Sequence, residues 1–226
     1  MSIREDLEKT EAVLLDRHFV YTGADHGTGY ANLRLIAHNA DLMSGIAAGL
    51  VMPFSGEAYD GLIGPETLGR TLVTYAPPYI RGASRRSMQH AIWCDISSGE
   101  EGQKVASFSE KMNFDRLIAG KRWLILEDLL TSGSTILATA ALVRQHEGYV
   151  VGAAVAARRN QSIDENKLGI PRLFVLEDLE GFDQFTPEEC AAIGPCSRQQ
   201  PIVRRPGHGW RYEEEHPDYP GGFVDL

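Results

Sequence analysis

The segment from residue 122 to residue 148 constrains the fold more tightly than any other part of the chain. Residues 122–128 (RWLILED) form a nearly continuous apolar run, which is typical of a strand buried on both faces of a sheet. The small, hydroxyl-rich sequence TSGST follows closely, and residues 136–148 have a helical pattern that ends in glycine. A strand, a turn and a helix in this order predict one unit of a parallel α/β sheet.

Similar patterns recur along the chain. Further strands are predicted at 59–63, 91–97, 104–110, 149–158 and 171–178, and helices at 2–18, 39–52 and 68–75. Their alternation predicts an α/β fold, an open and mostly parallel sheet with helices on both faces. We expect one domain over residues 1–180, including a small N-terminal hood at about 14–38. Residues 181–226, where proline, glycine and charge rise, are expected to form an extended C-terminal tail.

The charges and cysteines exclude several classes of protein. Thirty-one acidic residues outnumber 22 basic ones, which argues against a broad surface for nucleic acid. No apolar run reaches the roughly 18 residues that a membrane span needs, and the N-terminus lacks the basic start and apolar core of a secretory signal. Three scattered cysteines are typical of reduced thiols. We therefore expect a cytoplasmic protein that binds neither nucleic acid nor membranes.

The residues after the apolar run carry the most specific chemistry. Glu127 and Asp128 end the predicted strand, at the edge where open α/β sheets bind ligands. The turn and helix start, Thr131, Ser132, Gly133, Ser134 and Thr135, can direct N–H groups and hydroxyls toward a phosphate. Neither a Walker sequence nor a dinucleotide fingerprint is present. Acids and hydroxyls also commonly cap helices, but this combination favours a pocket for a sugar diol and a phosphate.

The sequence LILEDLLTSGST resembles the phosphoribosyl-diphosphate signature of type I phosphoribosyltransferases. The resemblance implies that Glu127 and Asp128 hold the ribose 2- and 3-hydroxyls and that residues 131–135 bind the 5-phosphate. It also implies Mg²⁺ bound mainly through 5-phosphoribosyl 1-diphosphate, transfer of the phosphoribosyl group to a nitrogenous base with release of pyrophosphate, and a homodimer.

Other segments are similar to orotate phosphoribosyltransferases, in the family's order. HFVYTGADHGTGYANLRL resembles their hood, and ASFSEK resembles the strand that enters their mobile catalytic loop. GPETLG resembles their pyrophosphate loop, which implies binding by Gly64, Glu66, Thr67 and Gly69. AARRNQ resembles the segment that contacts the orotate carboxylate, which implies this role for Arg159, beside Arg158.

The chain departs from these enzymes in its mobile loop. Only MNFDRLIAGKR separates Lys111 from Trp123, so the loop is short and has no histidine. Lys111 and Arg116 are the cations expected to join Asp128 in catalysis, although both could be solvated surface charges. Arg70 stands where a small or apolar residue is common in the pyrophosphate loop. Orotate is the favoured base, and two alternatives stay open: a purine phosphoribosyltransferase, or a non-catalytic regulatory protein that binds phosphoribosyl diphosphate.

The tail raises the question of a metal. Cys190 and Cys196 are five residues apart, and His208 and His216 follow. This spacing is not a recognised zinc pattern, and free cysteines are often small buried hydrophobes. The remaining histidines, His18 and His26 included, have no ligand spacing either. The sequence therefore predicts no metal held by protein ligands.

Overall fold

A computed structural model describes residues 3–21, 23–76, 90–100 and 102–226. They fall into two compact units. The first, which we call the sheet unit, is Ile36–Asp178, and the second, the hood–tail unit, combines Met1–Leu35 with Leu179–Leu226. The structure thus groups the predicted hood with the predicted tail, whereas the sequence pattern favoured placing the hood with the sheet.

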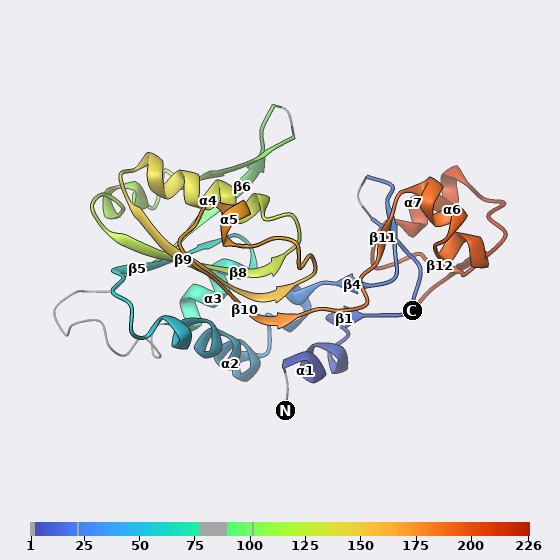
Figure 1. Cartoon of the computed structure of the whole chain (residues 1–226), viewed down its shortest axis with the longest axis horizontal. Coiled ribbons are helices and arrows are strands. Elements are labelled where there is room, and N and C mark those ends of the chain that lie inside the picture. Colours follow the sequence, from blue (N-terminus) through green and yellow to red (C-terminus); the bar gives the residue numbers. More distant parts are fainter. Residues whose placement is uncertain (1–2, 22, 77–89, 101) are drawn as a thin grey trace. The chain divides into compact units, whose positions relative to one another are not determined.

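The sheet unit is built on six strands in the order β10-β9-β8-β5-β6-β7 (Figure 1). Neighbouring strands are parallel except for β7, which pairs antiparallel with β6. The strands are β5 (Gly61–Pro65), β6 (His90–Ser98), β7 (Lys104–Ser107), β8 (Arg122–Leu130), β9 (Tyr149–Arg158) and β10 (Leu173–Asp178). The predicted α/β class with a mostly parallel sheet is confirmed.

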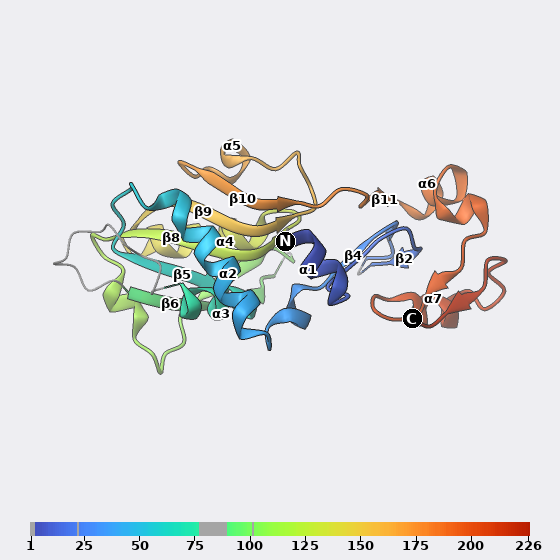
Figure 2. The same ribbon diagram turned by 90° about the horizontal axis from the view of Figure 1, so that it is seen from below.

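Helices cover both faces of this sheet. α2 (Ala40–Val51) and α3 (Leu68–Tyr75) pack together against one face, and α4 (Ser134–Gln145) packs against the other (Figures 1 and 2). Trp123 and Ile125 in β8 belong to the core that includes Ile136 of α4. Leu124 and Leu126 alternate with them and are also fully buried. Burial on both faces explains why this strand is apolar at every position rather than at every second one.

Short elements complete the sheet unit. They are η2 (Met52–Phe54), η4 (Phe114–Leu117) and α5 (Glu165–Leu168), while η1 (Leu33–Ile36) joins the two units in the chain. α2 begins at Asn39, whose side chain accepts a hydrogen bond from the Leu42 N–H at 3.1 Å.

The hood–tail unit is made of small elements from both ends of the chain. β2 (Phe19–Val20), β3 (His26–Gly27) and β11 (Gln184–Phe185) form one sheet, and β12 (Ile202–Val203) pairs with β13 (Phe223–Val224). The tail also contains α6 (Pro187–Ala192), η5 (Pro195–Arg198) and α7 (Gly209–Glu215), so it is folded rather than extended.

The predicted helix over residues 2–18 is too long. α1 ends at Lys9, and Glu11 follows with a φ of 57°. β1 (Val13–Leu14) then pairs antiparallel with β4 (Tyr30–Ala31). The hydrogen bonds of this pair compete with the helical pattern of the segment and prevail. In the part of the chain that the structure describes, no helix is both long and apolar enough to span a bilayer.

Candidate functional site

The strand order places a topological switch point between β5 and β8. From β5 the chain continues to β6 on one side, whereas β8, β9 and β10 follow one another on the other side. Open α/β sheets bind ligands beyond the carboxyl ends of the strands at such a point. The arrowheads of β8, β9 and β10 lie at the same edge of the sheet in Figure 1. Residues that follow β5, β8 and β9 therefore share this edge.

The predicted pyrophosphate loop, residues 64–69, packs directly against β8. A Cβ on Gly64 would lie 2.2 Å from the carbonyl oxygen of Gly69, and a Cβ on Gly69 would lie 2.8 Å from the carbonyl oxygen of Leu126. No side chain fits at either position without moving backbone. The two glycines thus hold the loop against the residue that immediately precedes the acid pair. The peptide bond between Glu66 and Thr67 is cis.

The structure gives Arg70 a local role. Its Nη1 donates to Glu66 Oε1 at 2.9 Å, and its guanidinium lies 4.3 Å from the ring centroid of Trp93. Both charged side chains are partly exposed, so the ion pair contributes little stability and its partners can exchange for a ligand. Asp95 lies beside them, and burial together with the Glu66 carboxylate raises the pKa of Asp95. Sequence reasoning missed Asp95, because only the pairing of β6 with β5 brings it to this loop.

The acid pair lies inside β8, because the strand continues to Leu130 instead of ending at Asp128. The Glu127 side chain is buried, with the residue only 6% exposed, and its Oε1 accepts a hydrogen bond from the Asp128 N–H at 3.0 Å. Asp128 is half-buried. Glu127 is therefore fixed, while Asp128 has the greater access to a ligand at the edge.

The predicted phosphate loop forms the start of α4. Gly133 is the N-cap with a φ of 79°, and the first helical residue is Ser134. The hydroxyl of Ser132 donates to the Ser134 hydroxyl at 3.0 Å. N–H groups in the first turn of a helix have no intrahelical acceptor, and the helix dipole favours an anion there. Thr131 and Thr135 flank this turn and are half-buried. The predicted helix start is present, and phosphate binding there stays a prediction.

Two consecutive arginines lie at the end of β9, Arg158 as its last residue and Arg159 directly after it, and the structure separates their roles. Arg158 makes a bidentate ion pair with Asp178, at 2.6 and 2.9 Å, and its Nη1 also donates to the Ile163 carbonyl. The Arg159 N–H donates to the carbonyl of Leu130 at 2.9 Å. Arg158 thus stabilises the sheet unit, and the backbone of Arg159 is anchored one residue before the phosphate loop.

The two predicted catalytic cations are not grouped with the acid pair. Lys111 lies in a turn after β7 and Arg116 lies in η4, and both are exposed. From η4 the chain enters the start of β8, where the Trp123 Nε1–H donates to the Ile118 carbonyl at 3.3 Å. The acid pair lies toward the opposite end of that strand.

One cysteine lies beneath the site. Cys94 in β6 is fully buried, and its Sγ lies 3.7 Å from the hydroxyl of Thr139 in α4. Burial raises the pKa of the Cys94 thiol to about 12, and the nearby Glu127 carboxylate adds to this effect. Cys94 is therefore a packing residue rather than a nucleophile.

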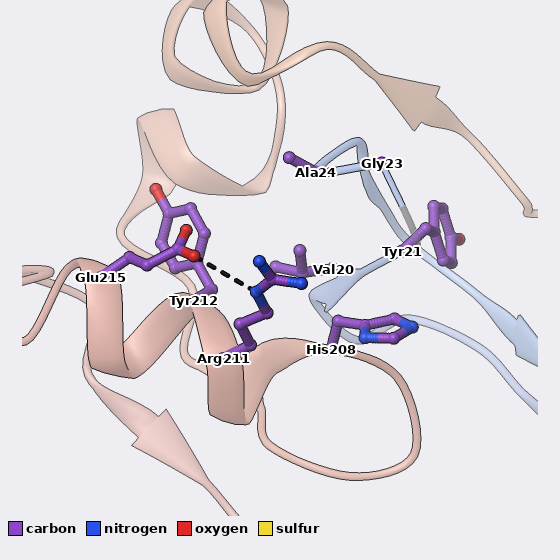
Figure 3. Close-up of a pocket in the computed structure, with 8 residues that line it drawn as sticks. All are labelled: Val20, Tyr21, Gly23, Ala24, His208, Arg211, Tyr212 and Glu215. Atoms are coloured by element: carbon purple, nitrogen blue, oxygen red, sulfur yellow. Dashed lines mark hydrogen bonds and ion pairs between the residues drawn. The ribbon is translucent and has the colours of Figure 1, made fainter.

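A cavity of about 230 Å³ lies in the hood–tail unit (Figure 3). Residues from both chain ends line it: Val20, Tyr21, Gly23, Ala24, His208, Arg211, Tyr212 and Glu215. The Arg211 side chain points into it and pairs with Glu215 at 3.2 Å. None of the predicted phosphoribosyl-site residues lines this cavity.

Comparison with known proteins agrees with the geometry. The phosphoribosyl transferase domain family, as a sequence model, matches residues 60–187. An orotate phosphoribosyltransferase of Campylobacter fetus subsp. fetus is 28% identical over 213 residues, which are 86% of this chain and 98% of that protein. An adenine phosphoribosyltransferase of Ureaplasma parvum is 36% identical over 74 residues, 33% of this chain and 43% of that protein.

A solved structure supports the fold. Orotate phosphoribosyltransferase from Aeropyrum pernix matches with a TM-score of 0.57 at 16% identity, covering 79% of this chain and 94% of that chain. At this identity the likeness bears on the architecture alone. The matched family region contains the loops after β5 and β8 and the two arginines at the end of β9.

Proposed function

The chain belongs to the phosphoribosyl transferase domain family, and from this premise we propose that it transfers the 5-phosphoribosyl group of 5-phosphoribosyl 1-diphosphate to a nitrogenous base, with orotate as the favoured base. One observation carries the proposal. Gly69, in the segment that follows β5, packs closely against the carbonyl of Leu126, directly before the acid pair of β8. This contact supports the proposal that a pyrophosphate loop and a ribose site adjoin at one sheet edge.

The proposed roles follow from this arrangement. The N–H groups of the loop after β5, with Gly64, Glu66, Thr67 and Gly69, bind the pyrophosphate. Asp128 accepts hydrogen bonds from the ribose hydroxyls, and Glu127, which is buried and bonded to the Asp128 N–H, supports it. The start of α4 binds the 5-phosphate. Binding at three points holds C1 of the ribose where the base attacks, and the departing pyrophosphate charge is stabilised by fixed dipoles.

The site offers Mg²⁺ two suitable carboxylates but few protein ligands in total. The carboxylates of Glu127 and Asp128 are hard oxygen ligands of the type that Mg²⁺ prefers. At this edge they supply few ligands, which fits an ion held mainly by the oxygens of the substrate and by water. When bound, the ion neutralises charge on the diphosphate. The residues that would hold it are Asp128 and Glu127.

The base is proposed from Arg159. Its backbone N–H donates to the Leu130 carbonyl, one residue before the phosphate loop, and a guanidinium can bind a carboxylate on the base through two parallel hydrogen bonds. The full-length similarity to proteins named as orotate phosphoribosyltransferases supports orotate. A purine is the second candidate, because a shorter stretch of the chain is more similar in sequence to an adenine phosphoribosyltransferase.

The catalytic cations are proposed to act in a homodimer. Lys111 and Arg116 are exposed, and η4 leads away from the acid pair of its own chain. We therefore propose that a second copy of this chain supplies Lys111 or Arg116 to each site. Mixing inactive Asp128→Asn and Arg116→Ala variants is expected to restore part of the activity if sites are shared.

Pyrophosphate release tests the function. The full chain is incubated with 5-phosphoribosyl 1-diphosphate and Mg²⁺ against orotate, uracil, adenine, guanine, hypoxanthine and xanthine. We expect release with orotate, accompanied by an equal amount of nucleoside monophosphate. Release with a purine alone would replace the proposed base and keep the transferase reaction. Binding of the phosphoribosyl diphosphate without release for any base would favour a regulatory protein and overturn the proposed activity.

A further inference from the structure

Two histidines and two cysteines converge in the hood–tail unit. In the part of the chain that the structure describes, His18, His26, Cys190 and Cys196 form the one group of three or more metal-ligating side chains whose ligand atoms all lie within 4.8 Å of one another. His18 Nε2 lies 2.7 Å from His26 Nδ1 and 3.7 Å from each sulfur, and His26 Nδ1 lies 3.4 Å from Cys196 Sγ. The sequence predicted no metal held by protein ligands and considered only His208 and His216 beside the cysteines, whereas the structure groups the cysteines with His18 and His26.

These distances match the edges of a tetrahedron around a metal. Zinc lies about 2.0–2.1 Å from histidine nitrogen and about 2.3 Å from cysteine sulfur, so its ligand atoms lie roughly 3.3–3.8 Å apart. Three of the four distances fall in or close to this range. The two ring nitrogens are closer, at hydrogen-bond distance, and a movement of about half an ångström would bring them into range.

The surroundings orient the ligands. The His18 Nδ1–H donates to the backbone carbonyl of Gln200 at 3.0 Å, which leaves the Nε2 lone pair directed at the cluster. The Tyr219 hydroxyl donates to the same carbonyl at 2.9 Å. The Cys196 N–H donates to Cys190 Sγ at 3.2 Å, which orients this sulfur. Each of these contacts supports a ligand from behind, as is usual around bound metals.

Without an ion, the cluster leaves buried polar groups poorly satisfied. His18, His26 and Cys190 are fully buried, so their ligand atoms are shielded from water. If His18 Nε2 accepts from His26 Nδ1–H, the two thiols are left with weak bonds in a water-poor site. A single cation would satisfy four lone pairs together.

We propose that His18, His26, Cys190 and Cys196 bind a zinc ion in a closed, four-coordinate structural site. Two nitrogens and two sulfurs suit zinc, and four protein ligands leave no open position for catalysis. The site would join the two ends of the chain, because His18 directly precedes β2 and His26 begins β3, while Cys190 lies in α6 and Cys196 in η5.

The fold of the hood–tail unit gives the ion a role. Its strands have only two residues each, and two distant stretches of chain must stay together. Such a small unit has little core of its own, and a metal is a common substitute for one. Gly194 is also fitted to the site, because a Cβ there would lie 2.8 Å from Cys190 Cα. This glycine lets the chain turn tightly between the two cysteines.

Metal analysis of the full chain tests the proposal. We expect one zinc per chain after expression in zinc-supplemented medium and purification under reducing conditions. Replacing the zinc by Co²⁺ is expected to give the intense visible absorption of a tetrahedral site with thiolate ligands. A strong chelator is expected to lower the Tm, and zinc, not Mg²⁺, to restore it.

Variants locate the ligands. His18→Asn and Cys196→Ser are expected to lose the zinc, whereas His216→Gln, which changes a nearby residue outside the cluster, and Cys94→Ser keep it. If the ligand variants fail to fold, the wild-type zinc content and Co²⁺ spectrum decide. The proposal is overturned if the reduced wild-type chain neither carries nor takes up zinc, if His18→Asn and Cys196→Ser keep it, or if Cys190 and Cys196 prove to be disulfide-bonded under these conditions.

Discussion

Replacing Gly64 by alanine tests how the two halves of the phosphoribosyl site are held together. The new Cβ would lie 2.2 Å from the Gly69 carbonyl oxygen and 2.3 Å from its carbonyl carbon, whereas ordinary contacts begin at 3.4 Å. Backbone, not a flexible side chain, blocks it, so the loop after β5 must move by about 1 Å. A misplacement of this size costs about 10²-fold in rate, or roughly 2.7 kcal/mol of transition-state stabilisation.

The assay is steady-state pyrophosphate release, read as kcat/KM for 5-phosphoribosyl 1-diphosphate. Overpacking is also expected to lower the free energy of unfolding by about 1–3 kcal/mol, so urea unfolding at the assay temperature accompanies the kinetics. Gly45→Ala is the matched control, because a Cβ there meets nothing within 4 Å and Gly45 lies inside α2. The free energy of unfolding of Gly45→Ala should rise by up to about 1 kcal/mol. Wild-type kinetics in a folded Gly64→Ala variant would refute the reasoning.

Three further predictions concern single side chains. Arg159→Ala should raise the KM for orotate more than the KM for phosphoribosyl diphosphate, and an equal rise in both KM values would remove Arg159 from the base site. Arg158→Ala should instead lower the urea concentration at which half of the protein is unfolded. Cys94 should resist alkylation by iodoacetamide at pH 8 in the native chain and react only on unfolding, because burial raises its pKa to about 12; rapid labelling of the folded chain would contradict this. The hydrogen-bonded Arg204 lowers the pKa of Glu213 below its ordinary 4.5. The pair therefore stabilises the fold above pH 4.5, and this stabilisation is lost as the pH falls through the lowered pKa. The unfolding free energies of Glu213→Gln and wild type should converge in acid, and a difference that stays constant with pH would count against the pair.

Local patterns predicted the parts of the molecule that local physics decides. The apolar run between Gly148 and Arg159 became β9 with the expected bounds, and residues 68–75 became α3 as expected. The strand, turn and helix start around residues 122–145 were also predictable, because one continuous segment carries all three. The contact of Arg70 could not be predicted in this way, because it is made with Trp93 from the neighbouring strand.

Long-range contacts limited the remaining predictions. The helical pattern over residues 2–18 gave way after Lys9 because Val13 and Leu14 pair with β4, a partner that periodicity does not identify. The cluster of two histidines and two cysteines combines residues more than 160 positions apart, at spacings that match no zinc pattern. Only the folded hood–tail unit brings them together, which is why the sequence predicted no metal held by protein ligands.

Calorimetric titration of 5-phosphoribosyl 1-diphosphate, with Mg²⁺ present, tests the central assignment most directly. Asp128→Asn removes a charged hydrogen-bond acceptor, an interaction of about 1.5–3 kcal/mol, so affinity should fall roughly 10- to 150-fold. Asp41→Asn makes the same chemical change at an exposed position of α2 and should bind like the wild type. Unchanged affinity in a folded Asp128→Asn variant would contradict the placement of the phosphoribosyl site between β5 and β8.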